Sequence, residues 1–151
     1  MKNFSPYLSG ALTTLLLVGI FSFVRTGPQS ADNQDKKTHR IVFQITTPDT
    51  SAYRSLARQL NNVLAKWPDA QIEVVAHNKG IGMLEKKKSN VSGEITALTA
   101  HGVKFVACEQ TLKQQKLEKT DILPDAGFVE RGLVHVVERQ EQGWAYIKAG
   151  F

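Results

Sequence analysis

Short runs of β-branched and apolar residues alternate with longer, helically spaced apolar stripes from Arg40 to the end of the chain. The stripe from Tyr53 to Trp67 is the clearest helical pattern, it ends at Pro68, and we expect its apolar side chains, including Trp67, to pack in the core. The runs predict four strands, at residues 41–45, 71–77, 103–107 and 144–148. The alternation predicts an α/β domain of three layers, with a mainly parallel sheet and helices on both faces.

Two further helices are expected between these strands. Residues 90–101 show apolar residues near helical spacing, and Gly102 follows them. A second stripe after the loop at 119–125 predicts a helix that bears Val129, Leu133, Val136, Val137 and Gln140. The short run at 144–148 is expected to be an edge strand.

An uncharged and mostly apolar stretch lies between Lys2 and Arg25. Because about 20 apolar residues span a bilayer core and no good small-x-small cleavage site follows, residues 1–25 are predicted to be a membrane anchor or signal segment, with an uncleaved anchor favoured. Residues 26–38 read as a polar tether, and residues 39–151 as the α/β domain.

The side of the membrane on which the domain lies is predicted from the charges at both ends of this stretch. Lys2 and the amino terminus compete under the positive-inside rule with Arg25, Lys36, Lys37 and Arg40 on the other flank, while the short amino-terminal tail favours export. We expect an inner-membrane anchor with the domain in the periplasm. The alternatives are a secreted periplasmic protein after cleavage and a domain on the cytoplasmic face.

Charge and ligand patterns exclude several classes of function. The chain has a net charge of +5, and without Lys2 and Arg25 it has 17 basic and 14 acidic residues, a net charge of +3, so no nucleic-acid partner is expected. A single cysteine excludes an internal disulfide. The four histidines are scattered without coordinating spacing, so neither a metal site nor a cofactor is expected.

The only cysteine, Cys108, ends the predicted strand at 103–107 and precedes a helix-like stretch that begins at Glu109. In open α/β sheets, ligands bind at the carboxyl ends of strands, where the next helix directs free N–H groups into the crevice. Such groups lower a thiol pKa, although the Glu109 carboxylate opposes this effect. The alternative is that Cys108 is a small buried hydrophobe.

A second strand ends nearby at His77 and Asn78, and Gly80 and Gly82 punctuate the turn that follows. The two polar side chains are candidates to hydrogen-bond the sulfur or an incoming acceptor, or simply to cap the turn. The glycines lack a complete phosphate-binding pattern, so tight-turn geometry is the favoured reading.

Three segments resemble the DsrE/DsrF-like family, also described by its YchN-like fold. They are residues 75–78 with Gly80, residues 102–112 and residues 138–148, and the resemblance extends over residues 40–148. It implies a compact α/β domain that assembles into trimers or hexamers. In sulfur-relay members a cysteine at the sheet edge carries a persulfide, and the matching position here is Cys108. Gln110 stands where the most similar subgroup usually has asparagine.

Two functions follow from these patterns. The first is a membrane-tethered sulfur-handling protein in which Cys108 carries a persulfide between donor and acceptor proteins. The second is a non-catalytic oligomeric module that binds a small ligand or protein while Cys108 is structural. The candidate catalytic residue is Cys108, and the candidate binding residues are His77, Asn78, Gly80, Glu109, Gln110 and Thr111.

Overall fold

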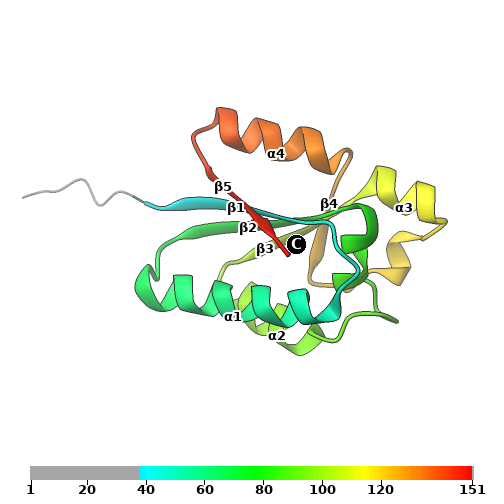
Figure 1. Cartoon of the computed structure of the whole chain (residues 1–151), viewed down its shortest axis with the longest axis horizontal. Helices are drawn as coiled ribbons and strands as arrows, with labels where there is room; N and C mark the ends of the chain where they lie inside the picture. The colour runs from blue at the N-terminus through cyan, green and yellow to red at the C-terminus, as the bar shows by residue number, and fades with distance from the viewer. Residues whose placement is uncertain (1–37, 151) are drawn as a thin grey trace, which may run out of the picture. The chain divides into compact units, whose positions relative to one another are not determined.

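A single parallel sheet of five strands organises the computed structural model, which describes residues 38–150 (Figure 1). The order across the sheet is β4-β3-β2-β1-β5, and every neighbouring pair is parallel. The strands are β1 (Arg40–Ile45), β2 (Gln71–Ala76), β3 (Lys104–Cys108), β4 (Ala126–Val129) and β5 (Ala145–Ala149). The predicted parallel α/β sheet is therefore confirmed.

Helices cover both faces of the sheet, which confirms the predicted three layers. Figure 1 shows α1 (Thr50–Lys66) and α2 (Ser92–Ala100) below the sheet and α4 (Gly132–Glu141) above it. The short helix α3 (Glu109–Gln115) continues directly from β3. Two 3₁₀ turns, η1 (Asn78–Met83) and η2 (Lys119–Asp121), complete the connections.

The main core lies between the sheet and the α1–α2 layer. Alternate residues of the strands point into it, and Tyr53, Leu56 and Leu60 of α1 meet them, all buried. The helix begins where Asp49 accepts a hydrogen bond from the Ser51 N–H at 2.8 Å. This side of the sheet is a conventional apolar interior.

The opposite face of the sheet is more polar, and α4 covers it. Its apolar cluster contains only three fully buried side chains, Val42, Val75 and Val136. Three buried polar side chains flank the cluster: Gln44 on β1, Glu73 on β2, and His77 directly after β2. A thin apolar layer with polar groups at both ends therefore distinguishes the α4 face from the main core.

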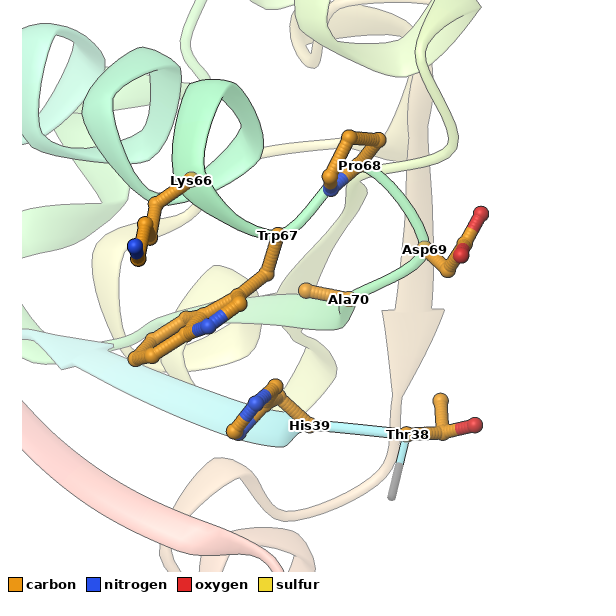
Figure 2. Close-up of a pocket in the computed structure, with 7 residues that line it drawn as sticks. All are labelled: Thr38, His39, Lys66, Trp67, Pro68, Asp69 and Ala70. Atoms are coloured by element: carbon orange, nitrogen blue, oxygen red, sulfur yellow. The ribbon is translucent and has the colours of Figure 1, made fainter. Parts of the chain in front are cut away.

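Two expectations about individual elements were wrong. Residues 126–129 form strand β4, so Val129 lies in the sheet and not on the helix that follows. Trp67 remains 38% exposed and stacks on His39, with ring centroids 3.9 Å apart (Figure 2). It is the C-cap residue of α1, beyond the last helical turn, and so it lies at the rim of the core.

The predicted anchor at residues 1–25 and nearly all of the predicted tether lie outside the described residues. Among the helices of residues 38–150, none combines the length and apolar character that a membrane span needs. The final strand was predicted at the sheet edge, and β5 does lie there, beside β1.

Candidate functional site

Cys108 is the last residue of β3 and also the N-cap residue of α3. This position results from the local sequence, because the apolar run Phe105–Ala107 ends at the sheet edge and a helix-forming stretch follows it. The cysteine is only 5% exposed and shares the α4 face with His77 of the neighbouring chain segment. The sulfur therefore lies at the carboxyl edge of the sheet, as predicted.

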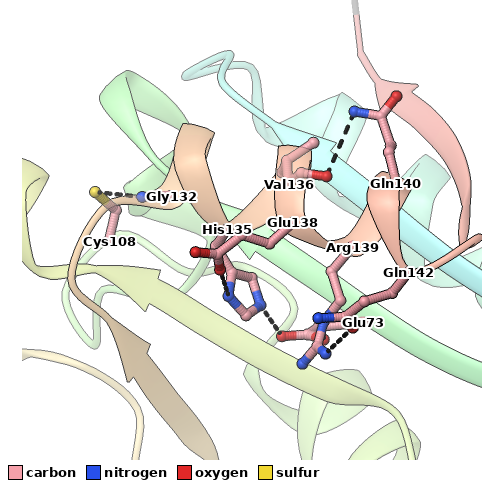
Figure 3. Close-up of polar contacts among 9 residues, drawn as sticks. All are labelled: Glu73, Cys108, Gly132, His135, Val136, Glu138, Arg139, Gln140 and Gln142. Carbon is pink, nitrogen blue, oxygen red and sulfur yellow. Dashed lines mark hydrogen bonds and ion pairs between the residues drawn. The ribbon is translucent and has the colours of Figure 1, made fainter.

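Several hydrogen-bond donors surround the sulfur. The backbone N–H of Gly132, the first residue of α4, donates to Cys108 Sγ at 3.2 Å, as Figure 3 shows. The protonated thiol itself reaches the Glu130 carbonyl in a long contact of 4.0 Å. The Gly132 N–H can thus stabilise the thiolate, and the Glu130 carbonyl can accept a hydrogen bond from the protonated thiol.

These donors shift the ionisation of the thiol. Burial raises the pKa of Cys108, but hydrogen bonds from the Thr111 hydroxyl and from the backbone N–H groups of Gly132, Thr111 and Gln110 lower it by more. The resulting pKa lies below the ordinary value of a thiol. Since the thiolate is the nucleophilic form, the site favours a reactive sulfur.

The beginning of α4 is packed tightly against the sulfur. A Cβ placed on Gly132 would lie 3.1 Å from Cys108 Cβ, 3.2 Å from His77 Cβ and 3.3 Å from Val75 Cγ1. Glycine at this position therefore lets the helix terminus approach the strand ends closely. The positive end of the α4 dipole adds to the attraction for a negative sulfur.

His77 belongs to a separate chain of polar contacts on the same face. Its Nε2 lies 2.7 Å from Gln44 Nε2, and the Tyr146 hydroxyl donates to Gln44 Oε1. Because Gln44 Oε1 is the acceptor from tyrosine, the amide nitrogen is the donor to the histidine. His77 Nε2 thus accepts, which places the ring proton on Nδ1.

The charge state of His77 follows from its surroundings. Burial lowers its pKa below the ordinary value and outweighs a hydrogen bond with the Asn78 side chain that raises it. Burial therefore favours the neutral form of the ring. His77 and Cys108 both lie against Gly132, but the histidine does not supply a positive charge to the sulfur.

Asn78 and Thr111 join the two strand ends. Asn78 has a positive φ of 50°, and its N–H donates to Thr111 Oγ1 at 3.1 Å. Its carbonyl accepts from the Gln115 side chain at 2.8 Å. The Thr111 hydroxyl thereby has a fixed acceptor role toward Asn78, which leaves its own proton for Cys108.

The other predicted binding residues lie farther from the sulfur or act only through the backbone. Gly80 packs against β1, where a Cβ would lie 2.2 Å from the Ile45 carbonyl oxygen, so it has a structural role in the turn. The Glu109 carboxylate pairs with Lys119 Nζ at 2.5 Å. Gln110 is exposed, and its backbone N–H donates to the Glu130 carbonyl at 3.1 Å.

Comparison with known proteins identifies the relationship suggested by the motifs. The model of the DsrE/DsrF-like family matches residues 39–149. The chain belongs to this family. Among curated proteins, no sequence matches it.

Solved structures with the DsrE-like fold are similar over most of the described residues. A protein of unknown function from Methanobacterium thermoautotrophicum is 37% identical, with a TM-score of 0.69, and the match covers 73% of this chain and 98% of that one. The ychN protein of E. coli is 12% identical with a TM-score of 0.59, covering 74% and 98% of the two chains. A conserved protein of unknown function from Bacteroides thetaiotaomicron is 15% identical with a TM-score of 0.60, covering 72% and 93%.

Four residues of this DsrE-like site escaped the sequence analysis. Gly132 and Glu130 precede or begin α4, and both use backbone groups that no side-chain pattern reveals. Gln44 and Tyr146 form the contacts to His77. A signal existed for Gln44, since it is a polar residue within the otherwise apolar run of β1.

The groups around Cys108 suit the chemistry of a thiolate. Within residues 38–150, no group of three or more His, Cys, Asp or Glu side chains is arranged to hold a metal ion. The donors present are neutral N–H and hydroxyl groups directed at one sulfur. Such a setting stabilises a thiolate or another anionic sulfur.

Proposed function

We propose that this DsrE-like protein handles sulfane sulfur through Cys108. The observation that carries the proposal is the hydrogen bond that the Gly132 N–H donates to Cys108 Sγ at 3.2 Å, at the carboxyl end of β3. The lowered pKa of the thiol, to which Thr111 contributes most, supports it. A thiolate is the form that attacks a persulfide. Membership in the DsrE/DsrF-like family, with its association with sulfur relay, supports the same chemistry.

The proposed reaction is two displacements at sulfur. The Cys108 thiolate attacks the outer sulfur of a donor persulfide, the donor's S–S bond breaks, and the donor thiolate leaves while Cys108 becomes a persulfide. An acceptor thiolate then attacks the outer sulfur of that persulfide, and the Cys108 thiolate leaves. The proton of the persulfide travels with the transferred sulfur or exchanges with water, and no redox partner is needed.

The predicted membrane anchor and assembly form part of this proposal. Residues 1–25 tether the domain to the inner membrane on its periplasmic side, as expected from the uncharged stretch between Lys2 and Arg25. The domain forms a homo-oligomer, a trimer or hexamer as in the resembling family. Exposed apolar side chains on the outer surface of α4, Leu133, Val134 and Val137, support such contacts.

A second candidate function is a non-catalytic binding module. The observation that favours it is the low exposure of Cys108, since reactive cysteines are usually partly exposed and this residue is only 5% exposed. In this alternative the thiol stabilises the packing between β3 and α4.

Intact mass spectrometry of the full chain separates the two functions. After incubation with a sulfane-sulfur donor, we expect the mass to increase by one sulfur atom, and a reductant or cyanide to reverse the increase. Because Cys108 is the only cysteine, Cys108→Ser is the control and remains unmodified. An unmodified wild-type protein with slow alkylation of Cys108 would exclude the carrier and favour the binding module.

A further inference from the structure

A second polar region lies under α4 at the opposite edge of the sheet from Cys108. It is a cavity of about 380 Å³ at the amino-terminal ends of β1, β2 and β3. Three cationic side chains line it, Arg40, Lys104 and Arg139, together with the amide side chains of Gln71 and Gln142 and the ring of Trp144. Its volume falls within the usual range of small-molecule sites.

The Arg139 guanidinium is held in position by three contacts. Its Nε donates to Glu73 Oε2 at 2.7 Å, its Nη1 donates to Gln142 Oε1 at 3.0 Å, and its guanidinium lies 4.9 Å from the centre of the Trp144 ring. Figure 3 shows Arg139 between Glu73 and Gln142. These contacts fix the plane of the guanidinium and leave some of its N–H groups without a partner among them. Free N–H groups of a fixed guanidinium favour the binding of an oxyanion.

The nearby carboxylate does not neutralise the other two cations. Both oxygens of Glu73 are already engaged, Oε1 by His135 Nε2 at 2.6 Å and Oε2 by Arg139, and the residue is only 2% exposed. Among residues 38–150, no carboxylate forms an ion pair with Arg40 or Lys104. Within the described part of the chain, the cavity therefore has two cations without a carboxylate partner beside an oriented guanidinium.

The carboxyl end of α4 does little to oppose an anion here. Helix carbonyls at this end carry a negative partial charge, but the last ones accept local N–H groups. The N–H groups of Gln142, Gly143 and Trp144 donate to the carbonyls of Glu138, Gln140 and Arg139, respectively, at 2.9–3.0 Å. The side-chain cations thus dominate the local field.

We propose that this cavity binds a small molecule through a doubly charged oxyanion group of the phosphate or sulfate type. Arg139 provides an oriented donor edge, Arg40 and Lys104 provide the charge, and the two glutamines supply neutral hydrogen-bonding groups. The site is independent of Cys108, which lies at the other end of α4. Binding at this site accordingly survives the loss of the thiol.

Calorimetric titration of the full chain with inorganic phosphate and with glycerol phosphate tests this proposal, with sodium chloride at matched ionic strength as the reference. We expect saturable binding to one site per chain, with Arg40→Gln and Lys104→Gln each weakening it roughly five- to tenfold. Stronger binding of the ester identifies an organic ligand, and equal binding identifies the oxyanion group alone; both results support the site.

Two control variants sharpen the result. Lys87→Gln removes the same charge from an exposed position outside the cavity and should bind phosphate as the wild type does. Cys108→Ser should also bind normally, even if the sulfur-carrier proposal fails. Absence of saturable binding, or equal weakening by Lys87→Gln and Lys104→Gln, would overturn the proposed site.

Discussion

At the scale of single residues, the state of Cys108 depends on neutral donors and not on a nearby cation. The Lys119 ammonium is paired with the Glu109 carboxylate, and burial lowers the pKa of His77, so neither side chain sets an unpaired positive charge against the sulfur. The Thr111 hydroxyl is the largest influence that lowers the cysteine pKa, followed by the Gly132 N–H. Thr111 is therefore the residue through which the thiol can be tuned.

Replacement of Thr111 should change the pH dependence of alkylation. In the wild type, where the thiol pKa is lowered, the thiolate persists to lower pH than in an ordinary cysteine and is lost as the pH falls through that value. Thr111→Val removes the hydroxyl with little change in volume and should raise the pKa of the Cys108 thiol, because the largest of the hydrogen bonds that lower it is lost. The alkylation rate as a function of pH measures this shift.

Thr111→Ser is the matched control, because it keeps the hydroxyl that serves both Cys108 and the Asn78 N–H. Its rate profile should stay close to that of the wild type. Identical midpoints for the valine and serine variants would show that the hydroxyl does not stabilise the thiolate.

At the scale of elements, α4 joins the two polar regions of its sheet face. Its first residue contacts the sulfur, while His135 and Arg139 one and two turns later hold the buried Glu73. Between them only Val136 contributes a fully buried apolar side chain. Polar contacts at both ends of α4 thus act together with a thin apolar cluster in placing this helix.

A methyl group at the start of α4 should disturb this placement. Gly132→Ala puts a Cβ within 3.1–3.3 Å of Cys108, His77 and Val75, so the free energy of unfolding should fall by about 1–3 kcal/mol. Gly93→Ala in α2 is the matched control, since nothing lies within 4 Å of its added Cβ, and it should stabilise the protein by up to ~1 kcal/mol. Urea unfolding measures both changes, and equal effects would exclude the packing argument.

The elements also show which features a sequence can reveal. The strands β1, β2, β3 and β5 were predictable from their apolar runs, and Cys108 was predictable at a strand end. The short strand β4 was not, because Gly127 interrupts its four residues and its end at Val129 fits the helical stripe that follows. Gly132 was not predictable either, since its role depends on a backbone N–H placed by tertiary structure.

At the scale of the whole molecule, the outer surface of α4 is the most apolar exposed part of the helical layers. Leu133 is 62% exposed, Val134 48% and Val137 45%, and Leu133 and Val137 belong to the stripe from which the helix was predicted. Because α4 is the only helix on its face of the sheet in the described residues, no second helix covers these side chains in the isolated chain. Their exposure is the structural argument for the proposed assembly.

Charge placed on this surface should dissociate the assembly. The double change Leu133→Glu and Val137→Glu introduces two buried charges into an apolar contact, and sedimentation should show a shift from oligomer to monomer. Ala97→Glu on α2 adds a charge to another exposed helical position and should leave the assembly intact. A wild-type monomer at micromolar concentration would contradict the proposed oligomer.

The strand order has a consequence for the synthesis of the chain. The strand β1, first of the five to be made, pairs on one side with β2 and on the other with β5, which comes last. During translation, the backbone N–H and C=O groups on one side of β1 therefore remain unpaired until residues 145–149 have left the ribosome. Backbone groups on that side stay available for wrong pairings, so the carboxyl terminus completes the fold and protects the nascent domain from aggregation.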